Sequence, residues 1–189
     1  MKATGWLKGL EVTAGGTGIV SHAGLALLRA LADRTGLTAA LSKALASDRV
    51  LVHDRGRVLA DLACAIADGA EVISDFRVMG DQHELFGLVA SVPTCWRALN
   101  ETAAGGGAAL ARISGAVNAA TLLAWLRLLA LDGHLAKAEP KTLRYRILHT
   151  AARLARSGRR RRLKIAASWP WAPAIVTAWD RITALPQAP

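Results

Sequence analysis

Apolar residues recur at helical spacing through most of this 189-residue chain, and that pattern limits its fold class. The clearest case is residues 54–69, where one side of the expected helix is apolar. Its inward residues are Val58, Leu62, Ala65 and Ile66. Leu and Ala dominate the composition, and only Leu10–Thr13 and Leu163–Ile165 look like strands. We therefore expect a mainly α fold, an irregular helical assembly with at most one or two short strands.

Two short helical patterns occur within residues 22–46, separated by a turn that contains Gly36. Thr38 is the expected N-cap of the second one. Such a pair is also typical of a helix-turn-helix, but a helix that reads bases needs polar side chains. The second helix offers only Ser42 and Lys43, so simple helix packing is favoured over DNA reading. Further helices are expected at 108–131, 140–156 and 172–185.

The acidic residues Asp54, Asp61, Asp68 and Asp75 recur every seven residues. Two helical turns rise by roughly 10 Å, which is too far for neighbouring members to hold one ion. A solvated helix face is therefore favoured over a metal site. The five histidines show no ligand spacing, so we expect no metal site there either.

The cysteines Cys64 and Cys95 are isolated in sequence, which favours a reducing cytoplasm over a disulfide framework or a zinc ribbon. The N-terminus has no apolar stretch of signal-peptide length. The longest apolar run, residues 119–131, is too short to cross a bilayer. We therefore expect a soluble, cytoplasmic protein with no membrane partner.

Positive charge is concentrated in the last third. Residues 1–120 hold 11 Lys and Arg against 11 Asp and Glu, whereas residues 121–189 hold 13 against 3 and so carry the whole net charge of +10. Such a field favours a polyanionic partner, with nucleic acid as the default, over a merely solvated loop. The side chains expected to contact DNA are Arg146, Arg153, Arg156, Arg159, Arg160, Arg161, Arg162 and Lys164.

Two sets of longer motifs stand out. The first is SHAGLALLRAL at 21–31, LVHDRG at 51–56, ADLACAIADGAEVISDFRVMG at 60–80 and LVASVPTCWRAL at 88–99. The second is LLALDGHLAKAEPKTLRYR at 128–146 and RRRRLKIAASWPW at 159–171. The first set resembles the N-terminal region of one family of insertion-sequence transposases. The second resembles the extreme C-terminus of the same family, which belongs to the DDE group with a ribonuclease-H-like catalytic domain.

The resemblance implies that the central catalytic domain is deleted, with the join in residues 108–131. No position matches the catalytic Asp, Asp and Glu, so we expect no catalytic residue, no enzyme activity and no ribonuclease-H-like α/β core. The intact family would use Mg²⁺, but we expect no cofactor here, because two-metal chemistry needs converging carboxylates. The acids after residue 120 are Asp132, Glu139 and Asp180.

The expected organisation is a helical, DNA-binding N-terminal region at 1–101, a linker and junction at 102–120, and a basic helical region at 121–189. The favoured function is a truncated transposase that retains at most DNA binding, with the terminal inverted repeats as the expected target. Full-length transposase, or a second copy of the chain, is a further expected partner. The alternatives are a non-functional translated fragment, and an arginine tract that once packed against acids now lost.

Overall fold

The computed structural model describes residues 6, 9–16, 21–47, 51–104, 119–157 and 160–187, and the fold is mainly α, as predicted. The helical segments are α1 (Leu25–Arg34), α2 (Leu37–Ala44), α3 (Arg55–Asp68), η1 (Ile73–Phe76), α4 (Arg77–Gly80), α5 (His83–Phe86), α6 (Val92–Ala104), α8 (Ala119–Trp125), η2 (Leu126–Ala130), α9 (Gly133–Ala136), α10 (Pro140–Leu143), η3 (Arg144–Leu148) and α11 (Ala172–Ala184). The strands are β1 (Leu10–Gly16), β2 (Ala152–Ser157) and β3 (Arg160–Ala166). No helix of the described residues is long and apolar enough to cross a membrane.

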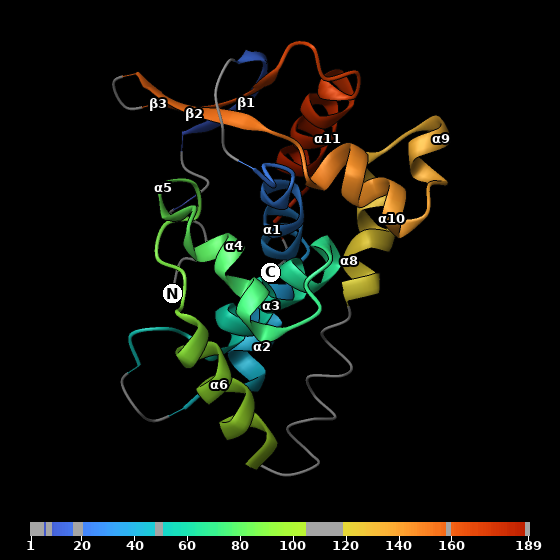
Figure 1. The fold of residues 1–189 in the computed structure, drawn as a ribbon. Helices are drawn as coiled ribbons and strands as arrows, with labels where there is room; N and C mark the ends of the chain where they lie inside the picture. The colour runs from blue at the N-terminus through green and yellow to red at the C-terminus, as the bar shows by residue number, and fades with distance from the viewer. Residues whose placement is uncertain are drawn as a thin grey trace.

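Helix α1 forms the centre of the core, because every residue from 25 to 33 is buried. It contacts α2, α3, α8 and α11, so helices from both ends of the chain surround it. Figure 1 shows the sheet at one end of the molecule and α6 at the opposite end. A single apolar cluster extends from Trp6 to Ile182, so residues that are distant in sequence share one core.

The three strands form one sheet in the order β1-β3-β2. Strand β1 lies parallel to the central strand β3, and β2 lies antiparallel to it. Two of these strands contain the stretches that looked like strands in the sequence. The third, β2, is one strand more than expected, and it lies where the sequence predicted a helix.

The predicted helix at 140–156 is therefore wrong beyond Leu148. Pro140 does occupy the first turn of α10, and η3 continues the helix as a π-helical segment to Leu148. After His149 the chain becomes extended, and Leu154 lies opposite Leu163 across the strand pair. Over a short run, an apolar stripe at helical spacing resembles the alternation of a strand, and pairing with β3 decides between the two.

The start of α2 also differs from expectation. The N-cap of α2 is Gly36, in a left-handed conformation (φ 79°), rather than Thr38. The hydroxyl of Thr38 instead donates to the Asp33 carboxylate at 2.7 Å. The predicted linker at 102–120 lies mostly outside the described residues, and the division into domains stays a prediction.

The aspartates at seven-residue spacing are predicted to form a solvated helix face, and this prediction is wrong for two of the four. Asp61 and Asp68 are 2% and 4% exposed. Asp61 pairs with Arg29 at 2.9 Å, and Asp68 accepts a hydrogen bond from His22 at 2.6 Å. Asp54 is the N-cap of α3, where its side chain accepts from the backbone N–H of Arg57. Partners that come from distant segments explain how these carboxylates can be buried.

Candidate nucleic-acid interface

Alternation along β3 divides the basic tract between the two faces of the sheet. Leu163 and Ile165 point to the core side and are at most 1% exposed. Arg160, Arg162 and Lys164 therefore point to the opposite side. Arg153 of β2 lies directly opposite Lys164, so it joins the same face. These four side chains, Arg153, Arg160, Arg162 and Lys164, are called the basic sheet face below.

One acidic side chain lies among these cations. Glu11 of β1 pairs with Arg162 in the register of the sheet and therefore projects to the same side. Its carboxylate is 3.0 Å from Arg162 Nε and 3.5 Å from Arg160 Nη1. Four cations and one carboxylate leave a formal charge of 4 − 1 = +3. All five of these side chains are at least partly exposed, so the charge faces water.

Arg161 and Arg156, which the sequence analysis included, lie opposite each other on the other face of the sheet. The Arg161 guanidinium donates to the backbone carbonyls of Trp6 and, at 3.3 Å, Glu84. Burial lowers the pKa of Arg161, and the nearby Arg156 charge adds to that effect. Arg161 therefore links three segments of the fold, whereas Arg156 is exposed.

Arg146 lies apart from the strands, in η3, with its guanidinium 4.8 Å from the ring centroid of Trp171. The Trp169 ring packs edge-on against that of Trp171, and its Nε1 donates to the Arg146 carbonyl at 3.0 Å. Stacking of this kind orients an arginine but also occupies one of its surfaces. Arg159 lies outside the described residues.

The α1–α2 pair has the two helices of a helix-turn-helix, but its surroundings favour packing. Helix α1 is buried throughout, and the Ser42 hydroxyl of α2 donates to the Asp54 carboxylate at 2.5 Å. Gly56 of α3 lies so close to α2 that an added Cβ would be 2.1 Å from the backbone nitrogen of Ser42. The exposed cation of α2 is Lys43.

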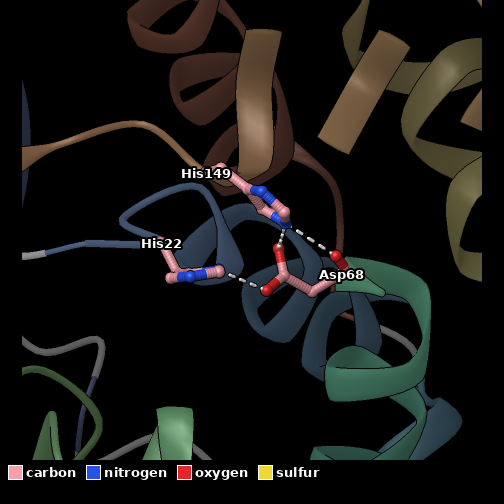
Figure 2. Close-up of side chains that lie close together, drawn as sticks. All are labelled: His22, Asp68 and His149. Atoms are coloured by element: carbon pink, nitrogen blue, oxygen red, sulfur yellow. Dashed lines mark hydrogen bonds and ion pairs between the residues drawn. The ribbon is translucent and has the colours of Figure 1, made fainter. Parts of the chain in front are cut away.

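A second cluster joins three segments that have no shared sequence motif. His22 precedes α1, Asp68 ends α3, and His149 follows η3. Figure 2 shows their three side chains close together. One potential ligand atom from each residue lies within 4.8 Å of the others. The hydrogen bond that His22 donates to the Asp68 carboxylate raises the pKa of His22. Sequence reasoning missed this cluster because its members are 46 and 81 residues apart.

The acids of the C-terminal region do not fit the Mg²⁺ site of the intact family. Asp132 is 72% exposed and paired with Arg181 at 2.5 Å, and Glu139 and Asp180 are exposed. Within the part of the chain that the structure describes, the one group of three possible metal ligands is His22, Asp68 and His149. That group holds one carboxylate, whereas two-metal phosphoryl transfer uses several.

One family model matches the C-terminal part of the chain. Residues 110–187 match the family model described as Transposase DDE domain group 1. This segment includes β2, β3 and α11, and hence all four side chains of the basic sheet face. The match confirms the resemblance to DDE-type transposases. Curated proteins and solved structures gave no match.

Proposed function

We propose that this chain is a truncated DDE-type transposase that binds DNA and has no catalytic activity. The match to the DDE-type transposases covers residues 110–187. The observation that carries the proposal is the basic sheet face. Its four cations project from neighbouring strands of one sheet, and the Glu11 carboxylate pairs with two of them, Arg160 and Arg162. Lys and Arg side chains arranged in this way bind phosphates without reading base sequence.

The electrostatic contribution of the basic sheet face to DNA binding can be expressed as the dependence of the binding constant K on salt concentration. Each phosphate neutralised on duplex DNA contributes about −0.9 to the slope of log K against log salt concentration. Three or four contacts from the basic sheet face therefore give a slope of about −3 to −4. Between about 50 and 200 mM salt, binding should weaken roughly 100-fold. Sequence preference has to come from other residues.

Two features support the lack of catalytic activity: the sequence itself, and the positions of the acidic side chains that the structure describes. No residue matches the catalytic Asp, Asp and Glu, and the acids of residues 121–189 lie exposed at separate places. The purified chain should therefore leave a DNA duplex that carries its own terminal inverted repeat uncut in the presence of Mg²⁺. Cleavage of that end would contradict the proposal.

DNA binding is best tested by fluorescence anisotropy with a duplex that carries the terminal inverted repeat and with a scrambled duplex. The test variant is Arg160→Gln/Arg162→Gln/Lys164→Gln, which removes three charges from β3. Loss of about three phosphate contacts should reduce the salt slope by about 2.7 and weaken binding to both duplexes.

The matched control removes three exposed cations that lie outside the sheet, Lys43, Arg77 and Lys137, each replaced by Gln. It has the same net charge as the test variant, so it separates a local contact from the field of the whole protein. Equal weakening by both variants, or wild-type binding that barely changes between about 50 and 200 mM salt, would refute the proposed interface.

A non-functional fragment is the competing interpretation, and several exposed apolar side chains favour it. Leu128 is 79% exposed, Leu88 is 70% exposed and Val52 is 83% exposed. Surfaces of this kind arise when a packing partner is removed. A fragment without a stable fold would unfold gradually, whereas the continuous core supports a cooperative thermal transition. Circular dichroism during heating distinguishes the two interpretations.

Contacts between the two ends of the chain support a stable fold. The backbone N–H groups of Ala23 and Gly24 donate to the carbonyls of Thr150 and Leu148, at 2.9 and 3.1 Å. Strand β1 pairs with β3 over nearly its whole length. The N-terminal and C-terminal regions therefore bury each other's backbone groups and apolar side chains.

A further inference from the structure

We propose that His22, Asp68 and His149 form a binding site for a divalent transition-metal ion, with Zn²⁺ as the best-suited ion. The two imidazoles and one carboxylate supply the ligand types that Zn²⁺ takes when three protein side chains bind it and a water completes the site. This ion would be separate from the Mg²⁺ of transposition, because none of the three residues matches the catalytic Asp, Asp and Glu of the intact family.

The carboxylate of Asp68 is the strongest evidence. It is 4% exposed, yet one of its oxygens, Oδ1, has no hydrogen-bond donor. The other oxygen, Oδ2, accepts from His22 Nδ1 at 2.6 Å. Arg144 is nearby, but its guanidinium donates to the carbonyls of Ala67 and Ile66 at the end of α3. A buried carboxylate oxygen without a donor is costly, and a bound cation would satisfy it.

His149 is placed to share that ion. Its Nε2 lies 3.4 Å from Asp68 Oδ1 and donates to the backbone carbonyl of Asp68 at 2.8 Å. The two imidazole rings lie with their centroids 4.4 Å apart and their planes tilted by 52°, and Figure 2 shows both directed at the carboxylate. Two ligands on one Zn²⁺ are separated by at most about 4.2 Å, since each metal–ligand bond is about 2.0–2.1 Å. The observed spread of 4.8 Å or less therefore needs only a small rotation of the rings.

The surroundings allow both that rotation and the entry of an ion. The side chains of His22 and His149 are 29% and 41% exposed, so the cluster opens to water on the imidazole side. Binding requires His22 Nδ1 and His149 Nε2 to be unprotonated, with each neutral ring carrying its proton on the other nitrogen. The two N–H hydrogen bonds are then replaced by metal–nitrogen bonds.

The site would also link the two ends of the chain. His22 has a left-handed backbone (φ 57°), which is rare for a residue other than glycine. The next two residues are held by the backbone hydrogen bonds to Thr150 and Leu148, beside His149. An ion bound by the native state alone stabilises the native fold. At a hundredfold excess over Kd, the melting temperature should rise by about 5–10 °C.

The test is isothermal titration calorimetry of the chelator-treated, dialysed full chain with ZnCl₂, together with thermal melts. We expect one Zn²⁺ per chain and the rise in melting temperature given above. The variants are His22→Asn, because asparagine tolerates the left-handed backbone, and His149→Gln. Each should weaken Zn²⁺ binding by tenfold or more, an effect in the range seen when groups around a metal are removed.

His134→Gln is the matched control, because this exposed histidine of α9 lies outside the cluster. It should bind Zn²⁺ like the wild type. Co²⁺ provides a second readout, since its visible spectrum reports how many ligands surround it. A folded wild-type chain that binds no Zn²⁺ would overturn the proposal and leave the cluster as a hydrogen-bond network. Wild-type affinity in both His22→Asn and His149→Gln would also overturn it.

Discussion

Replacing Asp61 with Asn should destabilise the protein more than the loss of any exposed ion pair. The Arg29 guanidinium, 3% exposed, is 2.9 Å from the Asp61 carboxylate, 2% exposed. Arg57 adds a second cation at 3.6 Å. Burial lowers the pKa of Arg29 and raises that of Asp61, so each charge in the core depends strongly on the opposite charge beside it.

The magnitude follows from the distance and the burial. Two unit charges 2.9 Å apart attract by roughly 6 kcal/mol at an effective dielectric constant of 20. Part of that attraction offsets desolvation, and breaking a buried pair costs about 3–5 kcal/mol. Arg29 keeps its bond to the Phe86 carbonyl and its place 5.1 Å from the Trp6 ring centroid, so it cannot move into water easily. The melting temperature should fall by about 6–20 °C.

Urea unfolding and thermal melts followed by circular dichroism measure the effect. The control is Glu101→Gln, since Glu101 is 47% exposed and pairs with Arg55 on the surface. That change should cost at most about 1 kcal/mol. The double variant Arg29→Met/Asp61→Leu should recover much of the loss, because an apolar pair leaves neither of these two positions with a buried charge that lacks its partner. An Asp61→Asn protein that melts within about 2 °C of the wild type would refute the reasoning.

Two further predictions concern the core. Gly24→Ala should lower the free energy of unfolding by about 1–3 kcal/mol or more, because the new Cβ would lie 2.0 Å from the carbonyl oxygen of Ile147. Urea unfolding measures this change. The control is Gly80→Ala, whose added Cβ meets nothing within 4 Å. Cys64 and Cys95 should not react with a thiol reagent at about pH 8 until the protein is unfolded. Both are fully buried, and burial raises the pKa of Cys95 to about 11 and that of Cys64 further. Rapid labelling of the native protein would contradict this expectation.

Local pattern was sufficient to predict much of the fold. The helix over α3 follows from its apolar spacing, and Val58 and Ala65 are buried as predicted, but Ile66 was predicted to face inward and is 44% exposed. The first turn of α10 follows from Pro140. The strand at Leu163–Ile165 follows from alternation. In each case the residues that specify the element lie within the element itself.

Pairing between distant segments could not be predicted in the same way. The sequence from 152 to 157 satisfies a helical stripe as well as a strand, and only the register with β3 selects the strand. The same register separates Arg161 from Arg160 and Arg162, which are its neighbours in a run of like charges. Because each step along a strand reverses the face, a count of arginines predicts charge but not which of them a ligand can reach.

Burial of the acids depended on such pairing as well. Spacing alone placed Asp61 and Asp68 on one side of a helix, and that arrangement is correct, but exposure was inferred from the residue type. Arg29 on α1 and the two histidines, which lie 46 and 81 residues away from Asp68, provide the partners that permit burial. These partners come from both ends of the chain. If the centre of a longer transposase has been removed, the contacts of α3 with α1, α8 and η3 act together with the pairing of β1 with β3 to keep the remaining ends folded as one body.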